Sequence, residues 1–394
     1  MERDIERAQA GALRDLIHER RSAMLGLTRA LVETESPSGD VEGSRAVVTL
    51  LAEAAKEIDE VTSVERIESR GYGEHLRIRA FDRAHDGAED GAGSILIVGH
   101  TDTVHPRGSL RERPWREEED RIYGPGIFDM KAGCVLALEA LRALAACELA
   151  PRRSVVVVLT CDEETGSDTG RALLEEEAAR ALCALVLEPP ASGGRVKTAR
   201  KGTGIFSMEV HGRAAHAGLE PEKGASAILE LARQIERLHA LNDASSGTSV
   251  NVGVIGGGTR SNVVAAEAHA EIDVRFSTQE EARRLDALIR EAQPFDDRVK
   301  LSVRGGINRP PLERTPGVVA LYEQARQIAA LLDFSLGEAS VGGASDGNFI
   351  AATGIAVLDG LGISGDGAHA THEHIAAGDI ATRGALLAGL IATL

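Results

Sequence analysis

The sequence is poor in cysteine, in aromatic residues and in positive charge, and each deficit excludes a class of protein. Its four cysteines form no C-x-x-C pair and lie in apolar stretches, so we expect structural thiols in a reducing compartment and no disulfide framework. The formal net charge of −17 argues against binding to nucleic acid or to an acidic membrane face. Aromatic residues make up 3% of the chain, which predicts cores of Ala, Val, Leu and Ile.

Long hydrophobic runs are absent as well. No segment approaches the roughly 20 apolar residues of a membrane span. The chain starts Met-Glu-Arg-Asp-Ile-Glu-Arg, which is charged and lacks the apolar core of a secretory signal. Together with the expected reduced thiols, these features predict a cytoplasmic protein.

The length of 394 residues exceeds one ordinary hydrophobic core, so two domains are expected. In residues 1–199 and 310–394, apolar strand-like runs alternate with helical patterns. This predicts an α/β domain with a mainly parallel sheet sandwiched by helices. Residues 200–309 follow the order strand, helix, strand, strand, helix, strand. That order predicts an inserted α+β domain, an antiparallel sheet with two helices on one face.

The same patterns predict element bounds. In the first domain, helical spacing is expected at Arg14–Leu31, Val41–Ile58, Lys131–Ala146, Arg171–Leu182 and from Thr315 onward. In the insert, the expected strands are Gly204–His211, Ser249–Ile255, Val263–Phe276 and Val299–Val303, and the expected helices are Ala225–Leu241 and Thr278–Ala292.

Three apolar runs of the first domain end at residues that can bind metals, and a further such residue, Asp129, stands in Gly-Ile-Phe-Asp-Met-Lys. The runs and the residues after them are Ser94–Val98 with His100 and Asp102, Ser154–Thr160 with Glu163 and Glu164, and Ala184–Leu187 with Glu188. Ligands of open α/β sheets bind outside the carboxyl ends of the strands. The sequence therefore predicts that these side chains share one site.

This set of side chains indicates metal chemistry. An imidazole with several carboxylates suits zinc, manganese or cobalt better than calcium or magnesium. Carboxylates that converge without a cation would repel one another, so convergence implies a metal. Neighbouring Glu163 and Glu164 cannot easily bind one ion in the same manner, which favours one as a ligand and the other as general base on a metal-activated water. Residues two apart on a strand point the same way, so His100 and Asp102 can face the site together.

The motifs around these residues resemble those of the co-catalytic dinuclear zinc metallopeptidases. The motifs are His-Thr-Asp-Thr-Val from His100, Gly-Pro-Gly-Ile-Phe-Asp-Met-Lys-Ala-Gly from Gly124, and Asp-Glu-Glu-Thr-Gly-Ser from Asp162. That family includes glutamate carboxypeptidase, acetylornithine deacetylase, succinyl-diaminopimelate desuccinylase and the aminoacylases. The similarity runs from about Leu25 to the C-terminus. Motif order and loop lengths are most similar to the glutamate carboxypeptidase branch.

The resemblance implies a role for each residue. Glu163 would be the general base and acid. Asp102 would orient His100, since a metal-bound imidazole usually donates its other N–H to a carboxylate or carbonyl. The implied metal ligands are Asp129 bridging both ions, His100 and Glu188 on one ion, and Glu164 with a late histidine on the other.

Three histidines near the C-terminus are candidates for that late ligand. The family pattern is a glycine-rich turn, a histidine, a glutamate four or five residues later and an apolar residue. It fits His369 with Glu373 and Ile375 best. His372 and His374 form a His-x-His pair that could bind metal by itself, although a solvated position at the start of the last helix is the simpler expectation.

Other positions match the family's substrate-binding residues. His216, in Gly-Arg-Ala-Ala-His-Ala-Gly, matches a histidine that reaches the neighbouring subunit's active site and polarises the substrate carbonyl. Asn262 and Arg275 match positions that hold substrate polar groups, the arginine facing a carboxylate as a two-pronged donor. A surface ion pair is the alternative for Arg275. Gly343 and Ser345 belong to a glycine-rich loop that matches the family's substrate loop.

The resemblance implies a metal-dependent amidohydrolase that releases a carboxylate-bearing amino acid, glutamate-like by preference, from an N-acyl amino acid or short peptide. Metal-bridged hydroxide, formed with Glu163 as base, would attack the amide. Two divalent ions per chain are expected, zinc first, with cobalt or manganese as alternatives. The inserted domain would mediate a homodimer and close over the substrate. Open alternatives are an aminoacylase, a dipeptidase or another amide or amine hydrolase of this fold, and a non-catalytic metal-binding dimer.

Overall fold

The computed structural model describes residues 5–82 and 93–394, and the chain forms two compact units. Unit 1 comprises Met1–Thr198, Arg314–Ser340 and Ser345–Leu394, and unit 2 comprises Ala199–Glu313 and Val341–Ala344. Each unit has its own hydrophobic core. The first four residues of the charged N-terminal segment lie outside the described residues.

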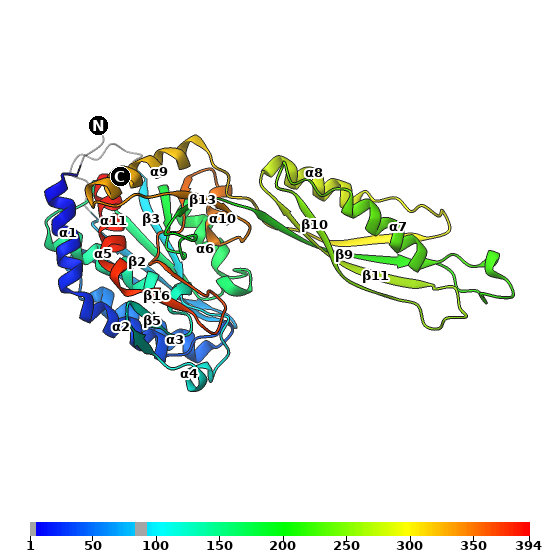
Figure 1. The fold of residues 1–394 in the computed structure, drawn as a ribbon, viewed down its shortest axis with the longest axis horizontal. Helices are drawn as coiled ribbons and strands as arrows, with labels where there is room; N and C mark the ends of the chain where they lie inside the picture. The colour runs from blue at the N-terminus through cyan, green and yellow to red at the C-terminus, as the bar shows by residue number, and fades with distance from the viewer. Residues whose placement is uncertain (1–4, 83–92) are drawn as a thin grey trace. The chain divides into compact units, whose positions relative to one another are not determined.

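A six-stranded sheet forms the centre of unit 1, in the order β1-β2-β6-β3-β7-β14 (Figure 1). Strands β6, β3, β7 and β14 run parallel, while β1 and β2 pair antiparallel with their neighbours. The bounds are Val61–Ser69 (β1), Gly73–Ala80 (β2), Ser94–His100 (β3), Val155–Thr160 (β6), Ala181–Val186 (β7) and Ala356–Leu358 (β14). The predicted α/β class with a mainly parallel sheet is confirmed.

The connections between parallel strands place helices on both faces of this sheet. Helix α5 (Ala132–Ala146) leads from β3 to β6, and α6 (Gly170–Ala178) leads from β6 back across β3 to β7. Because such crossovers are right-handed and these two run in opposite directions, α5 and α6 cover opposite faces. The other helices of unit 1 are α1 (Arg7–Glu19), α2 (Arg21–Glu33), α3 (Val41–Lys56), α4 (Ser109–Glu112), α9 (Pro316–Leu331), α10 (Asp346–Ala352) and α11 (Ile380–Thr393).

Short elements complete unit 1. A small sheet has the order β15-β16-β5-β4, and β8 pairs with β13 where the chain passes between the units. The bounds are Arg116–Glu118 (β4), Arg121–Tyr123 (β5), Val196–Arg200 (β8), Glu338–Val341 (β13), Gly365–Asp366 (β15) and His374–Ala376 (β16). Three short helical segments are the π-helical η1 (Ile127–Lys131) and the 3₁₀ turns η2 (Glu163–Thr165) and η4 (Ala377–Asp379).

Burial explains the continuous apolar runs of unit 1. All of β6 is buried, and so is β3 after its first residue. Strands covered on both faces need no polar alternation. Helix α5 is buried almost all round, as expected of a helix that is apolar on every side. The core therefore lies between the sheet and its helices and ends where the strands end.

Unit 2 is an antiparallel sheet in the order β10-β11-β9-β12, with α7 and α8 on one face (Figure 1). Alternate residues of β11, from Ala268 to Phe276, are buried in the core of this unit. Ser226 and Thr278 cap α7 and α8 by accepting a backbone N–H from the first turn. The bounds are Gly202–His211 (β9), Ser249–Gly257 (β10), Glu267–Phe276 (β11), Lys300–Arg309 (β12), Pro221–Lys223 (η3), Ala227–His239 (α7) and Gln279–Arg290 (α8).

Two predicted helices were wrong in their bounds. The helix expected at Arg14–Leu31 is two helices, because Arg20, with φ −86° and ψ 0°, ends α1 and precedes α2. The helix expected at Arg171–Leu182 ends at Ala178, because the residues from Ala181 onward pair with β3 as β7.

Predictions for the last strand of the insert and for the tail were also wrong. Strand β12 does not stop at Val303 but continues past Gly305 and pairs with β9 as far as Arg309. At Gly305 φ is 91°, and an added Cβ would lie 2.1 Å from a carbonyl oxygen, so glycine is required there. His374 does not begin the last helix, since it pairs with β5 as part of β16, and α11 starts only at Ile380. The β1-β2 hairpin was not predicted at all.

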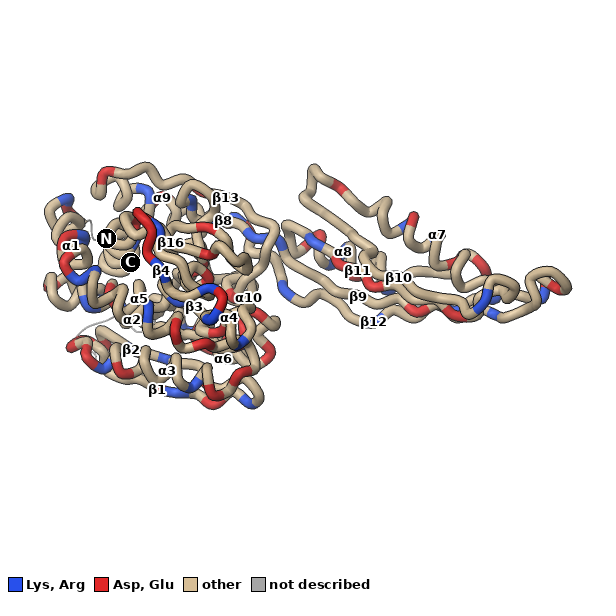
Figure 2. Tube along the Cα trace, turned by 60° about the horizontal axis from the view of Figure 1, so that its bottom comes forward, with Lys and Arg blue, Asp and Glu red and all other residues tan. Residues whose placement is uncertain are grey.

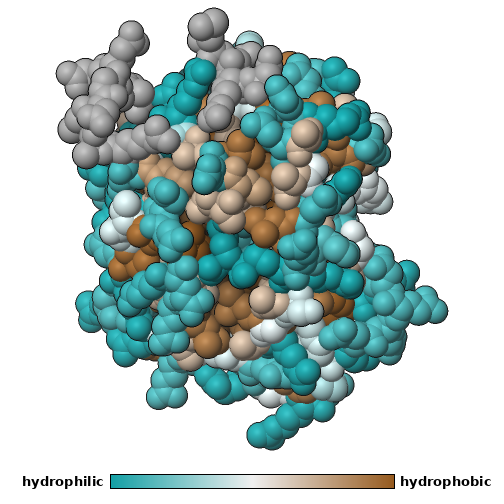
Figure 3. Space-filling model, turned by 90° about the vertical axis from the view of Figure 1, so that its left-hand side faces the viewer, coloured by the Kyte–Doolittle hydropathy of each residue, from teal (hydrophilic) through white to brown (hydrophobic). Residues whose placement is uncertain are grey.

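The surface is polar and acidic. Figure 2 shows Asp and Glu residues over both units, in keeping with the net charge of −17. On the face drawn in Figure 3, hydrophilic residues surround scattered hydrophobic patches. Among the described residues no helix has the length and apolar character needed to cross a membrane. All four cysteines are free thiols, and Cys134, Cys161 and Cys183 are buried.

Glycine-to-alanine changes in two helices should have opposite effects. An added Cβ at Gly133 of α5 would lie 2.7 Å from the Leu187 carbonyl oxygen, whereas at Gly26 of α2 it meets nothing within 4 Å. We expect Gly133→Ala to destabilise the protein by about 1–3 kcal/mol through overpacking. Gly26→Ala should stabilise it by up to about 1 kcal/mol through helix propensity. Thermal melting of both variants checks this, and equal shifts would contradict it.

Candidate metal centre

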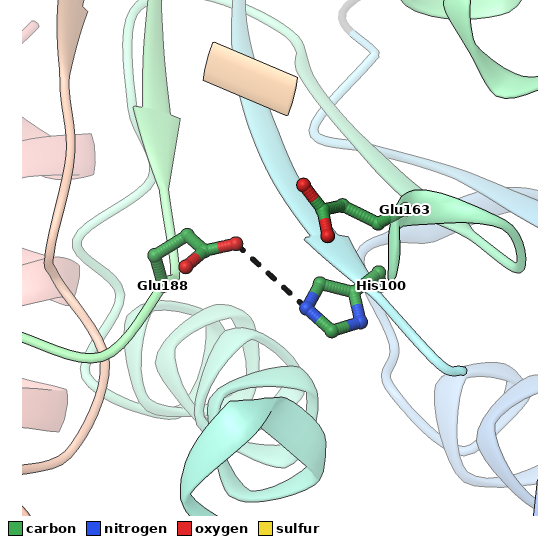
Figure 4. A group of neighbouring side chains, drawn as sticks. All are labelled: His100, Glu163 and Glu188. Atoms are coloured by element: carbon green, nitrogen blue, oxygen red, sulfur yellow. Dashed lines mark ion pairs between the residues drawn. The ribbon is translucent and has the colours of Figure 1, made fainter. Parts of the chain in front are cut away.

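The ends of β3, β6 and β7 bring three predicted site residues together. The chain leaves β3 for β6 on one side and then crosses back to β7 on the other, and such a reversal opens a crevice at the carboxyl ends of the strands. His100 ends β3, and Glu163 and Glu188 closely follow β6 and β7. Figure 4 shows their side chains around one space, and their ligand atoms lie within 4.8 Å of one another.

The two ring nitrogens of His100 have different surroundings. Nδ1 lies 3.0 Å from the Asp102 carbonyl oxygen, an acceptor, so Nδ1 carries a hydrogen and donates it. Nε2 lies 3.2 Å from Asp129 Oδ1 and 3.7 Å from Glu188 Oε1. In a neutral ring the Nε2 lone pair would face two carboxylates, which requires either a second proton or a cation. Burial lowers the pKa of this imidazole, but the bonds to Asp102 and Asp129 outweigh burial and raise that pKa.

Asp129 presents a separate oxygen to each of two histidines. Its Oδ1 faces His100, and its Oδ2 lies 3.4 Å from His369 Nε2. His369 Nε2 is also 3.1 Å from Glu164 Oε2. Although burial raises the pKa of the Asp129 carboxyl, its bonds to the two imidazoles outweigh burial and hold that pKa low. This geometry fits a carboxylate shared by two cations.

The turn η2 directs two neighbouring glutamates to different partners. Glu163 groups with His100 and Glu188, whereas Glu164 groups with His100 and Asp129. Glu164 Oε1 is buried and has no hydrogen-bond partner among the described residues, and burial raises the pKa of this carboxyl to about 8. A divalent cation would satisfy this oxygen and the converging negative charge, so the residues fit a metal.

Asp102 connects the end of β3 with the turn after β6. Its carboxylate accepts the N–H of Glu163 at 3.2 Å and that of Glu164 at 3.1 Å, while its carbonyl oxygen holds His100. The hydroxyl of Ser38 also donates to this carboxylate, at 2.6 Å. Sequence reasoning missed Ser38, because it stands 64 residues before Asp102 and no motif marks it.

Of the three late histidines, the structure brings His369 to Glu164 and Asp129. Its side chain is half exposed, and its φ of 63° is uncommon for a residue other than glycine. His374 instead makes a local hydrogen bond, its Nδ1–H donating to the His372 carbonyl oxygen at 2.9 Å. His372 is exposed.

In unit 2, His216 and Asn262 lie on paired segments. The N–H of Ala217 donates to the Asn262 carbonyl oxygen at 3.0 Å. His216 Nδ1 accepts the N–H groups of Gly218 and Leu219 at 3.1 and 3.2 Å. Because Nδ1 accepts, the hydrogen of the neutral ring lies on Nε2, which is a donor.

Arg275 lies on β11 opposite Thr203, at the end of the unit 2 sheet that is away from His216, and it forms an ion pair with Asp273. Its Nε and Nη2 donate to the two carboxylate oxygens of Asp273 at 2.8 and 2.9 Å. The ion pair that was the alternative for this arginine is therefore present. Its side chain is 35% exposed, which leaves room for a further partner.

The loop residues Gly343 and Ser345 make local hydrogen bonds. The Gly343 carbonyl oxygen accepts from Arg200 Nη1 at 3.2 Å. Ser345 is fully buried, and its hydroxyl donates to Asp359 and accepts the N–H of Gly347 at the start of α10. Its side chain thus supports the helix terminus.

The model of Peptidase family M20/M25/M40 matches residues 96–393 of the chain. The chain belongs to this family. Carboxypeptidase G2 from Pseudomonas sp. (strain RS-16) is 29% identical over 355 residues, covering 88% of this chain and 83% of that protein. A succinyl-diaminopimelate desuccinylase from Verminephrobacter eiseniae is 31% identical over 319 residues, covering 75% and 77%. The solved aminopeptidase PepT from Bacillus cereus shares the fold, with a TM-score of 0.79 at 24% identity, covering 95% of this chain and 98% of that one.

This M20/M25/M40 peptidase is therefore a metal-dependent hydrolase that acts on carbon–nitrogen bonds. The family predicted from the motifs, the fold class and the enzyme class are confirmed. The metal-competent residues of unit 1 provide a centre for the ions that such an enzyme needs.

Removing metal from this peptidase should lower its stability. Without cations the carboxylates of Asp129, Glu163, Glu164 and Glu188 repel one another. We expect a chelator to lower the melting temperature, and free Zn²⁺ at about 100 times its Kd to restore about 2.7 kcal/mol of unfolding free energy. Ca²⁺, which prefers oxygen ligands alone, is the control and should restore less. Melting that is indifferent to chelation and to Zn²⁺ would contradict this.

Proposed function

We propose that this protein is a two-metal amidohydrolase that releases a carboxylate-bearing amino acid, with glutamate favoured, from an N-acyl amino acid or a short peptide. The observation that carries the proposal is Asp129, whose two oxygens face His100 and His369 separately. A carboxypeptidase and a desuccinylase among the relatives support cleavage of an amide in a carboxylate-bearing substrate.

The proposed centre holds two divalent ions, with zinc favoured and cobalt or manganese as alternatives. Bound ions supply Lewis acidity that activates water and polarises the amide carbonyl. The proposed ligands are His100, Glu188 and Asp129 for one ion, and Asp129, Glu164 and His369 for the other.

Glu163 is proposed as the general base and acid. It is 8% exposed, it lies beside His100 and Glu188, and Asp102 fixes its backbone N–H. From there it takes a proton from the attacking water and gives it to the leaving nitrogen as the C–N bond breaks. The products are a carboxylic acid and an amine, and Glu163 returns to its starting charge.

Arg275 is proposed to bind the substrate carboxylate. Asp273 occupies the Nε and Nη2 edge of the guanidinium. The end formed by Nη1 and Nη2 is a second edge on which a carboxylate can form two hydrogen bonds. In this arrangement Asp273 sets the orientation of the guanidinium and leaves the second edge to the substrate carboxylate.

His216 is proposed to stabilise the oxyanion that forms at the attacked carbonyl. Two backbone N–H groups hold its Nδ1, so Nε2–H is a donor of fixed direction, which suits an oxyanion site. Asn262 lies beside it and is proposed to hold a polar group of the same substrate.

We propose that His216 and Asn262 serve the active site of the partner subunit in a homodimer. Arg275 pairs with Thr203 at the start of β9, whereas His216 lies beyond the end of that strand. A ten-residue strand such as β9 is about 33 Å long, so one small substrate cannot touch both ends in a single chain.

Exposed apolar residues support the dimer. Strand β10 is an edge of the sheet and exposes Val254 and Ile255, and the neighbouring helix α7 exposes Ile228 and Leu229. Open edges with apolar neighbours are surfaces on which a second copy can pair. A two-fold contact there would place the same surface of both subunits together.

The experiment that tests the function is release of free amino acid from a panel of N-acyl amino acids and dipeptides, with enzyme reconstituted with Zn²⁺, Co²⁺ or Mn²⁺. We expect metal-dependent turnover that favours acyl-glutamate and acyl-aspartate. Arg275→Ala should lower kcat/KM on these substrates about 10- to 100-fold, the loss of a charge-assisted hydrogen bond. Arg304→Ala, at an exposed arginine of the same unit, is the control and should change little.

Other outcomes separate the alternatives. Preferred turnover of N-acyl amino acids with uncharged side chains, which still carry the α-carboxylate, indicates an aminoacylase. Cleavage confined to dipeptides with a free amine indicates a dipeptidase. Binding of two ions without turnover on any substrate overturns the enzymatic proposal in favour of a metal-binding dimer.

Dimers mixed from two variants test both the role of Glu163 and the proposal that His216 acts in the active site of the partner subunit. Glu163→Ala and His216→Ala should each lower kcat by at least about 100-fold and leave metal content unchanged. If His216 acts on the partner, mixing the two variants restores one complete site in each mixed dimer, about a quarter of wild-type activity at random assembly. Mixing Glu163→Ala with Glu164→Ala is the control and restores nothing. Absence of recovery in the first mixture would contradict action on the partner.

A further inference from the structure

A buried carboxylate that the proposed reaction does not use lies behind Asp129. Glu373 is 3% exposed, and its oxygens accept three backbone N–H groups of the loop that ends in Asp129. Oε2 accepts from Gly126 at 2.7 Å, and Oε1 accepts from Phe128 and Asp129 at 2.9 Å each. Hydrogen bonds to an ionised carboxylate are about twice as strong as neutral ones. Glu373 therefore fixes the backbone of the residue that faces both histidines of the centre.

Two further side chains determine how Glu373 is held. His105 Nε2 lies 2.6 Å from Glu373 Oε2, and Arg113 Nη1 lies 3.3 Å from His105 Nδ1. An arginine can only donate, so His105 Nδ1 accepts and Nε2 carries the hydrogen that is donated to Glu373. The carboxylate thus receives four donors, all from behind the metal centre.

The same group ties the C-terminal tail to the Asp129 loop. Arg113 Nη1 also lies 3.5 Å from the carbonyl oxygen of Ala370, the residue after His369. The Glu373 carbonyl oxygen accepts the N–H of Gly124 at 3.3 Å. Segments that are distant in sequence, one carrying Asp129 and one carrying His369, are therefore joined directly at Glu373.

We propose that Glu373, held by His105 and Arg113, is a positioning residue for the metal ion assigned to Glu164 and His369. The inference rests on the proposed two-metal function, and Glu373 itself does not contact the ion. Without its carboxylate, the loop that carries Asp129 loses three hydrogen bonds to the tail, and the ligands lose their fixed separation. Changes to a residue that holds metal ligands from behind typically cost about 10- to 100-fold in metal affinity.

The test is titration of the metal-free, full-length protein with Co²⁺, followed by calorimetry and visible absorption. In Glu373→Gln, either orientation of the amide places an NH₂ group against N–H donors where an acceptor stood. We expect the second equivalent of Co²⁺ to bind about 10- to 100-fold more weakly than in the wild type, with an altered absorption spectrum. Glu176→Gln, at an exposed glutamate of α6, is the control and should match the wild type.

His105 provides a matched pair of variants that leaves Glu373 intact and remains informative if Glu373→Gln does not fold. In His105→Gln the amide N–H takes the place of Nε2–H, whereas His105→Leu removes the donor. We expect His105→Leu to weaken the second equivalent of Co²⁺ and His105→Gln to restore its affinity to within a few-fold of the wild type.

The outcomes distinguish this role from the function on which it rests. A wild type that does not bind two Co²⁺ ions per chain overturns the two-metal proposal and this role with it. If the wild type binds two ions, and Glu373→Gln and His105→Leu bind both with unchanged affinity and spectrum, the role of Glu373 is overturned even where melting temperatures fall. In that case Glu373 contributes to folding stability alone.

Discussion

Convergence of negative charge is the constraint on which this structure depends. The carboxylates of Asp129, Glu163, Glu164 and Glu188 meet around His100 at the ends of buried strands. Like charges brought together and removed from water are costly, and divalent cations offset that cost. The polypeptide has to hold these side chains in place against their own repulsion. Rigid strand ends and hydrogen bonds to the backbone of Glu164 and Asp129 can do this, because they fix the position of these residues through the main chain.

In two parts of the centre, a buried carboxylate accepts backbone N–H groups of the site residues. Asp102 accepts the N–H groups of Glu163 and Glu164, and Glu373 accepts that of Asp129. In each case a buried acid that is not assigned to a metal sets the backbone of a proposed ligand, Glu164 or Asp129, and Asp102 also sets that of the proposed base Glu163. Charge-assisted bonds of this kind are short and directional, so they fix position as well as add stability. The fold contributes by ending β3, β6 and β7 at one crevice, which lets anchors from distant segments reach the same turns.

The residues that the structure brings together at the strand ends could be predicted because each signal is local in sequence. His100 and Glu188 follow apolar runs that only a buried strand explains, and strand ends meet at one edge of the sheet. Glu373 matched a pattern, but its contact with Asp129 spans 244 residues, and no periodicity reveals such a pairing. The length of β12 was missed because glycine usually ends a strand, whereas Gly305 is required there by a close approach of β9. The prediction was therefore limited by contacts between distant segments and by a glycine inside a strand, and less by the choice of chemically competent residues.

The length of the unit 2 sheet connects substrate binding with dimerisation. Its sheet has a separate core and four paired strands, so its two ends cannot approach each other by bending. The residue proposed for the substrate carboxylate, Arg275, lies at one end, and the proposed oxyanion donor, His216, lies beyond the other. A single small substrate can use both only if they come from different chains. Under the proposed function, a lone subunit would keep its metal ligands and its carboxylate site but lack the donor. Dimerisation would then be a requirement of the chemistry in addition to a source of stability.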